Sequence, residues 1–182
     1  MAKTNKESSN LFVLSSAEVS PNLKPTDGWM FSARDSCDGS IWLYKQEPRL
    51  LADGRWILDG EVDLEDAVCL LAYDIPAIEE GRLYYLGFGW QTQRGRKWID
   101  SYECGNGLQW TDGWRWLAMD GDRLCHLFDL QPRPIGQGRK LVWTNSGRKV
   151  RTPFGVKNLS TKGPMYISFE QELRLKQSKA VG

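Results

Sequence analysis

The chain has 182 residues, of which 41% are hydrophobic and 26% are charged, and its mean hydropathy is −0.49. This length and composition are typical of one folded domain, and they exclude wholesale disorder and a membrane-spanning helix. The first ten residues carry no apolar run followed by a cleavage site, so we expect no secretory signal and a cytoplasmic location. Nine tryptophans are an excess that a core, an interface or a ligand site has to explain.

The net charge of +1 conceals a strong asymmetry along the chain. Residues 1–91 hold 8 Lys and Arg against 15 Asp and Glu, whereas residues 92–182 hold 16 against 8. Residues 53–80 carry nine acids and one base, and residues 130–182 carry eleven bases and two acids. Two interpretations stay open: one face repels phosphates while another attracts them, or the two segments pair across the fold and neutralise each other.

Turn signals and short apolar runs predict a structure made almost entirely of strands. Asp-Gly dipeptides, which favour turns with a positive φ, occur six times, at residues 27, 38, 53, 59, 112 and 120. We expect strands over residues 39–46, 55–59, 67–73, 82–93, 96–103, 139–144, 148–153 and 164–174. We expect hairpins that pair residues 48–52 with 55–58, 108–110 with 114–116, 117–119 with 124–127, and 139–144 with 148–153.

These elements predict an all-β fold, an antiparallel meander of about nine or ten short strands that forms a barrel or a sandwich. One β domain is expected over residues 11–176, with an acidic half to about residue 91 and a basic end from about residue 131. Residues 1–10 and 177–182 are expected to be flexible tails. Asp-Gly-Trp occurs at Asp27 and again at Asp112, but two occurrences define no repeat of fixed period.

The residue types that support catalysis are sparse. His126 is the only histidine, and its neighbour Cys125 would point to the opposite face of a strand, so the pair cannot form a catalytic dyad. The four cysteines form no C-x-x-C motif and predict reduced thiols, although disulfides are not excluded. We therefore expect no enzymatic activity, no metal and no cofactor.

An acidic segment and a tryptophan cluster are the candidate protein interface. Four acids at every second position could bind a hard cation, but a solvated docking surface is the favoured interpretation: Asp59, Glu61, Asp63 and Glu65. Five tryptophans lie close together in the sequence and could form core, an interface or a stacking platform: Trp90, Trp98, Trp110, Trp114 and Trp116. Trp114 and Trp116 would share a strand face, and we assign them to the interface. The alternative is a β module that binds carbohydrate or another small ligand on Trp110, Trp114 and Trp116.

The basic end of the chain is the candidate nucleic-acid contact. Bases alternate with aromatic residues there, so cations could neutralise phosphates while an indole stacks on a base. The alternatives are a solvated cationic hairpin or one that docks on an acidic protein. The residues assigned to this contact are Arg139, Lys140, Trp143, Arg148, Lys149 and Arg151.

Two segments of the chain carry a resemblance to a known family. Residues 82–90 (RLYYLGFGW) form an aromatic strand with Gly-Trp, and residues 163–174 (GPMYISFEQELR) form a Gly-bounded strand that ends in Arg. In the order and composition of its segments, though without a diagnostic spacing, the chain resembles the small accessory subunit of type III-D CRISPR effector complexes. The acidic residues 53–80 depart from that pattern, and no functional residue of the family carries over.

The resemblance implies a non-catalytic subunit in antiviral defence, bound to larger RNA-binding subunits around a guide RNA. Together with the charge pattern, it leads us to expect an accessory subunit of a larger, RNA-containing complex. The acidic segment would dock on larger protein subunits and the basic hairpin would lie near RNA, with no membrane involved.

Overall fold

The computed structural model describes residues 11–60, 63, 65–70, 74–88, 98–104, 107–152 and 163–182. Strands dominate these residues and only two segments are α-helical, so the predicted β-rich fold is confirmed. Contacts divide the chain into two compact units, residues 1–90 (unit 1) and 91–182 (unit 2). The division coincides with the change in charge, because unit 1 contains all the charged residues of the acidic half.

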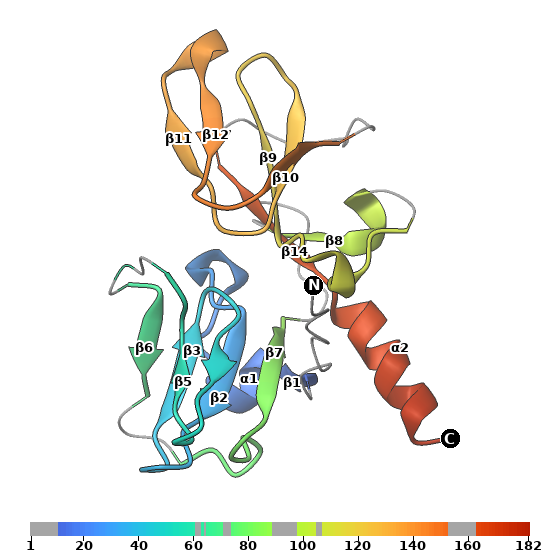
Figure 1. Ribbon diagram of the computed structural model, residues 1–182. Helices are drawn as coiled ribbons and strands as arrows, with labels where there is room; N and C mark the ends of the chain where they lie inside the picture. The colour runs from blue at the N-terminus through green and yellow to red at the C-terminus, as the bar shows by residue number, and fades with distance from the viewer. Residues whose placement is uncertain are drawn as a thin grey trace, which may run out of the picture. The chain divides into compact units, whose positions relative to one another are not determined.

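Unit 1 is built around a mixed five-stranded sheet with the order β1-β7-β2-β3-β6 (Figure 1). β1 pairs in parallel with β7, and the other three pairs are antiparallel. The strands are β1 (Leu11–Ser15), β2 (Phe31–Arg34), β3 (Ile41–Tyr44), β6 (Ala67–Cys69) and β7 (Leu83–Gly87).

Short elements complete unit 1. A helical turn, α1 (Ser16–Val19), follows β1, and a 3₁₀ turn, η1 (Pro25–Asp27), precedes β2. β4 (Arg49–Leu50) and β5 (Trp56–Ile57) follow β3 and precede β6 in the sequence and form a hairpin. This hairpin confirms the predicted pairing across Asp53-Gly54. Gly54 has a φ of 86°, as this turn requires.

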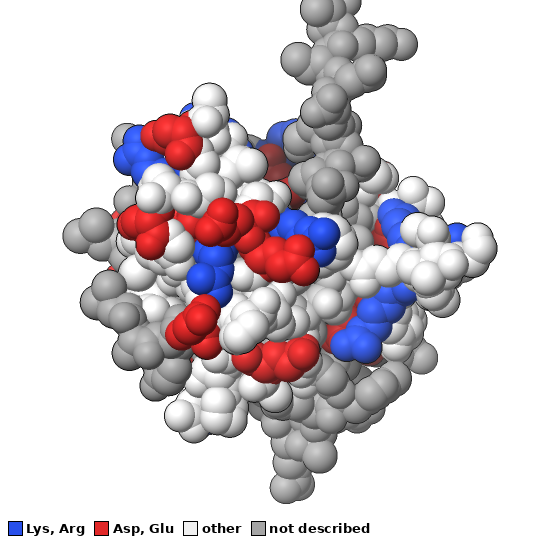
Figure 2. All heavy atoms as spheres, turned by 90° about the horizontal axis from the view of Figure 1, so that it is seen from below, with Lys and Arg blue, Asp and Glu red and all other residues white. Residues whose placement is uncertain are grey.

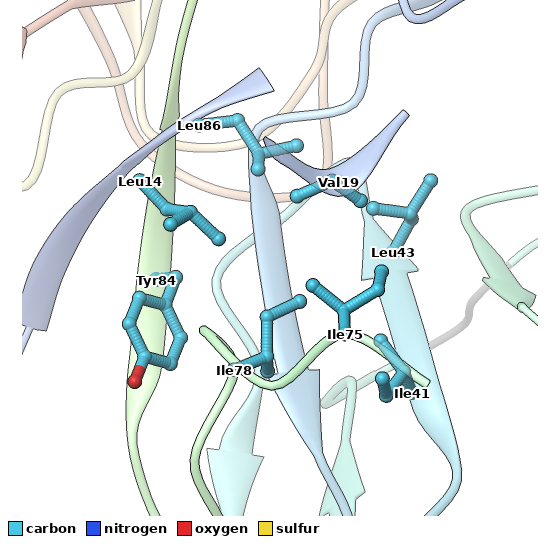
Figure 3. Packing of buried hydrophobic residues seen from close by; sticks show 8 residues of the cluster. All are labelled: Leu14, Val19, Ile41, Leu43, Ile75, Ile78, Tyr84 and Leu86. Carbon is cyan, nitrogen blue, oxygen red and sulfur yellow. The ribbon is translucent and has the colours of Figure 1, made fainter. Parts of the chain in front are cut away.

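The core of unit 1 lies between the sheet and the segments that cover it. Buried side chains from β1, α1, β3, β7 and residues 75–78 point toward one another (Figure 3). They are Leu14, Val19, Ile41, Leu43, Ile75, Ile78, Tyr84 and Leu86. Burying apolar area of this kind is the main favourable contribution to folding.

Unit 2 contains a second mixed five-stranded sheet, with the order β13-β10-β9-β14-β8. β8 pairs in parallel with β14, and the other three pairs are antiparallel. The strands are β8 (Trp98–Asp100), β9 (Trp116–Met119), β10 (Cys125–Phe128), β13 (Lys149–Arg151) and β14 (Met165–Ser168).

The remaining elements of unit 2 lie outside this sheet. A hairpin pairs β11 (Arg133–Ile135) with β12 (Val142–Thr144), and the chain ends in the helix α2 (Glu170–Ala180) (Figure 1). Three 3₁₀ turns are η2 (Ser101–Cys104), η3 (Trp110–Asp112) and η4 (Gly138–Lys140).

The two units have the same topology. Read from the parallel edge, the strand orders β1-β7-β2-β3-β6 and β8-β14-β9-β10-β13 correspond one to one in sequence order and in direction. In both units a helical turn follows the first strand, a 3₁₀ turn precedes the second, and a two-stranded hairpin precedes the last antiparallel edge strand. The chain is therefore a structural duplication.

Hydrogen bonds outside the ladders repeat in the same places. In each unit the residue before the second strand donates to the third strand and accepts from the strand on its other side. The pairs are Met30 N–H to Tyr44 O with Leu86 N–H to Met30 O, and Arg115 N–H to Phe128 O with Ile167 N–H to Arg115 O. The repetition extends from topology to individual backbone groups.

The recurring Asp-Gly-Trp marks the same turn in both units. Asp27 accepts from the Lys24 N–H at 2.8 Å, and Asp112 accepts from the Gln109 N–H at 2.7 Å. The next residue is a glycine in the left-handed region each time, with φ of 81° and 82°. The sequence interpretation that these occurrences define no repeat is therefore wrong.

Several strand predictions fail for local physical reasons. Residues 110–112 form η3 instead of one arm of a hairpin, because the Asp112 carboxylate closes a 3₁₀ turn on Gln109. Residues 170–180 form α2, although residues 164–174 were predicted as a strand and residues 177–182 as a tail. The pairings of β1 with β7 and of β8 with β14 are parallel, so the sheets are no antiparallel meander, and the described strands close no barrel.

The predicted hairpin of residues 139–144 with 148–153 is also wrong. β12 pairs with β11, and β13 pairs with β10, so the two basic segments belong to different ladders. The pairing of β9 with β10 across Asp120 confirms the hairpin predicted there.

One buried carboxylate in each unit ties the hairpin to the main sheet. Asp35 and Asp120 follow the second sheet strand and are 6% and 5% exposed. Asp35 accepts the Trp56 backbone N–H of β5 at 2.8 Å, and Asp120 accepts the Trp143 backbone N–H of β12 at 2.7 Å. A buried amide that loses its acceptor is costly, so each carboxylate fixes the position of its hairpin.

We predict that Asp35→Ala and Asp120→Ala each lower the free energy of unfolding by about 1–3 kcal/mol, because each leaves a buried N–H without its acceptor. Urea denaturation measures the change. The control Glu65→Ala removes an exposed acid and is expected to cost less than about 0.5 kcal/mol. Equal losses for the control and the two buried positions would contradict the proposed role.

Candidate functional site

The charge of the two units differs strongly in the segment that follows the third sheet strand and ends with the edge strand that pairs with it. We name residues 46–70, which contain β4, β5 and β6, the acidic module, and residues 130–152, which contain β11, β12 and β13, the basic module. The acidic module has two bases and seven acids, and the basic module has six bases and no acid. Equivalent segments of one fold thus carry net charges of −5 and +6.

The edge strands show this difference residue by residue. Lys45 donates its N–H to Asp66 O in unit 1, and Asp129 donates its N–H to Arg148 O at the same place in unit 2. In that register Asp66, Ala67, Val68 and Cys69 correspond to Arg148, Lys149, Val150 and Arg151. Since unit 1 forms the same ladder without these bases, the ladder itself does not require them.

Two bases of the basic module are held by their own unit. The Arg148 Nε donates to the Asp129 carboxylate at 3.3 Å, and its guanidinium lies 4.7 Å from the ring of Trp114. The Lys149 ammonium donates to Trp143 O at 2.8 Å and lies 3.4 Å from Asp120 Oδ2. These contacts order both side chains and neutralise part of their charge.

The other three predicted bases are exposed and make no ion pair with a described residue: Arg139, Lys140 and Arg151. Arg139 and Lys140 belong to η4, at the tip of the β11–β12 hairpin. The turn between β9 and β10 supports this tip, because Gly121 donates its N–H to Leu141 O at 2.8 Å. A Cβ at Gly121 would collide with the backbone at Gly138, so only glycine permits this close approach.

The predicted stacking role of Trp143 needs correction. Its side chain is 5% exposed, so neither face of the indole is open to a base. Trp56 occupies the equivalent position in unit 1 and is also buried, so both indoles belong to the packed interior of their units. In each of them the Nε1 has no hydrogen-bond partner among the described residues.

The tryptophans assigned to an interface or a platform are mostly covered. Trp116 is 4% exposed and packs edge-on against Tyr166, so it belongs to the core and not to an interface. Trp114 is half-buried under Arg148, and Trp110 lies 3.5 Å from the guanidinium carbon of Arg115. Trp98 is also buried, and Trp90 lies outside the described residues.

The acidic module presents its charge to solvent. Asp59, Asp63 and Glu65 are exposed, as expected for a solvated surface, and they lie in no strand that would align them for a cation. Glu61 lies outside the described residues. Asp59 pairs with Arg49 and Asp53 pairs with Arg55, both at the surface. Acidic side chains gather around a few basic ones on the face that Figure 2 shows.

His126, the four cysteines and one acidic cluster are candidate groups for catalysis or metal binding among the described residues. His126 Nδ1 lies 3.3 Å from Asp120 Oδ2, and burial, together with the charge of Lys149, lowers the pKa of this imidazole. All four cysteines are free thiols, and burial raises the pKa of Cys104 to about 12. Asp35, Cys37 and Asp38 form the acidic group with metal-ligand spacing in the described residues, but Asp35 already accepts the Trp56 N–H.

Sequence reasoning missed the duplication, although a signal for it was present. Asp27-Gly-Trp and Asp112-Gly-Trp are 85 residues apart, and so are the buried carboxylates Asp35 and Asp120. This shared offset was the signal that the halves are related, although it changes to 87 residues at Trp56 and Trp143 and to 82 residues at Asp66 and Arg148.

Neither helix of the described chain is long and apolar enough to cross a membrane. Comparison with protein-family models, with curated proteins and with solved structures finds no match for this chain.

Proposed function

We propose that this protein is a non-catalytic, cytoplasmic subunit of a larger RNA-containing complex, and that its basic module contacts RNA phosphates. The observation that carries the proposal is a segment with six bases and no acid, on a scaffold whose other copy forms without them. Charge that folding does not need, at exposed positions of one strand and one hairpin tip, suits a polyanionic ligand.

The basic module is better suited to contact RNA phosphates than to stack on nucleobases. Arg139, Lys140 and Arg151 are exposed cations, whereas the buried Trp143 offers no stacking surface. Contacts of this kind position RNA without selecting its sequence. The resemblance to the accessory subunit of type III-D CRISPR effector complexes gives this ligand a specific form, a guide RNA held mainly by larger subunits.

The acidic module fits the role of a docking surface for a basic protein. Its exposed acids repel RNA, so the two modules would keep protein and RNA contacts apart. The alternative, a carbohydrate-binding module, has less support because Trp116 is buried and arginine side chains lie over Trp110 and Trp114. A sugar platform needs open aromatic faces.

We predict that replacing Arg139, Lys140 and Arg151 together by Glu lowers the affinity for single-stranded RNA by tenfold or more, because about three phosphate contacts are lost. Fluorescence anisotropy with a labelled RNA oligonucleotide measures the affinity. The control replaces Lys24, Arg174 and Lys179 by Glu, which changes the net charge equally outside the basic module. A similar loss in the control, or no binding by the unaltered protein, would contradict the proposed function.

The salt dependence of binding provides a second prediction. Three to six phosphate contacts to a single strand give a slope of log K against log salt of about −2 to −4. The triple Glu variant should have a slope smaller in magnitude by about 2, since three contacts are removed. Titrations at several NaCl concentrations measure both slopes, and identical slopes would show that these side chains contact no phosphate.

A further inference from the structure

The exposed apolar side chains of the described residues concentrate on the two modules. Eight large hydrophobic residues are exposed, and five of them lie in β4, β6, β11, β12 and β13: Leu50, Val68, Ile135, Val142 and Val150. Val68 and Val150 occupy equivalent positions, opposite Leu43 and Leu127. Clusters of exposed apolar residues rimmed by charge are typical of protein–protein interfaces.

The edge strands add a second property of an interface. β6 and β13 each end their sheet, and each pairs with one neighbouring strand in the described structure. The outer edge of such a strand presents backbone donors and acceptors that can pair with another chain. Both modules therefore combine a sheet edge with exposed apolar residues, of which Val68 and Val150 lie at equivalent places on the edge strands.

Their charges are opposite and nearly equal, at −5 and +6, in a chain whose net charge is +1. Two copies of the chain therefore repel each other little at long range, because the net charge is close to zero. At short range, the acidic module of one copy and the basic module of another attract each other. A second copy thus supplies a partner module with the same strand topology, with exposed apolar residues and with the opposite charge.

We propose that the acidic module of one copy binds the basic module of a second copy, so that the protein associates head to tail. Because the contact joins two different surfaces, each copy keeps one module open, and the association continues into larger oligomers. This inference does not depend on RNA binding. If RNA also binds the basic module, RNA and the second copy compete for Arg139, Lys140 and Arg151.

Sedimentation velocity of the full chain over a range of concentrations tests the proposal. At roughly 0.05 M NaCl the mass should rise with concentration from 20.8 kDa to at least twice that value, and it should return to the monomer at roughly 0.5 M NaCl, where salt screens the contact. Unaltered protein that stays monomeric at the highest soluble concentration in low salt would overturn the proposal.

Two charge-reversal variants make the test specific. Variant A replaces the exposed acids Asp59, Asp63 and Glu65 by Lys, and variant B replaces Arg139, Lys140 and Arg151 by Glu. Each variant alone should stay at 20.8 kDa, because A has no acidic module left and B has no basic one. An equimolar mixture should associate again, since A keeps its basic module of charge +6 and B keeps its acidic module of charge −5. Restored association also shows that both variants are folded.

A matched control and RNA separate this proposal from the proposed function. The variant with Lys24, Arg174 and Lys179 replaced by Glu has the net charge of variant B but intact modules, and it should associate like the unaltered protein. Loss of association in this control, or association of A or B alone, would overturn the proposal. Variant A should bind RNA at least as tightly as the unaltered protein while it loses association, so failure of one proposal is distinguishable from failure of the other.

Discussion

A buried carboxylate at the end of the second sheet strand is the interaction on which each unit depends. Asp35 and Asp120 accept the backbone N–H of a tryptophan in the neighbouring hairpin. The hairpins are short, and isolated two-stranded ribbons have little stability of their own. The carboxylate and the buried indole of the same tryptophan hold the hairpin on its unit, and this contact positions the charged side chains that the hairpin carries.

Comparison of the two duplicated units distinguishes the residues that the fold requires from the charged residues that it does not require. The features that both units share are structural: the Asp-Gly-Trp turn, the buried carboxylate, the hairpin tryptophan and the central valine of the edge strand. The charges around these features differ in sign between the units. The same scaffold thus carries an acidic module in unit 1 and a basic module in unit 2. The near-zero net charge of the chain is the sum of these opposite charges.

Local sequence patterns predicted the elements whose formation depends on neighbours in sequence. The β4–β5 and β9–β10 hairpins follow from an Asp-Gly turn between apolar runs, and β14 follows from its alternation. The parallel pairs could not be predicted, because β1 and β7 meet from positions about seventy residues apart, and no local pattern specifies such a pairing. Trp143 stands among basic residues in the sequence, and its burial depends on tertiary packing, in which its backbone N–H also bonds to Asp120.

The basic module was identified from bases that alternate with aromatic residues, although two of its cations proved to be internally paired and its tryptophan buried. The acidic segment was predicted as a solvated docking surface, and its described acids Asp59, Asp63 and Glu65 are exposed in a connection of irregular structure. Patterns of residue type indicated which segments carry charge, whereas the exposure of each side chain depended on the packing of the whole unit.

The central claim is that the scaffold is independent of the charge it carries, and one exchange tests it directly. Asp66→Arg, Ala67→Lys and Cys69→Arg give β6 the side chains of β13 and change the charge of the acidic module from −5 to −1. The measurement is the RNA affinity of this variant, with its thermal unfolding as a check of the fold. We predict unfolding within a few degrees of the unaltered protein and several-fold tighter RNA binding. Loss of the folded state, or an unchanged affinity in a folded variant, would contradict the account.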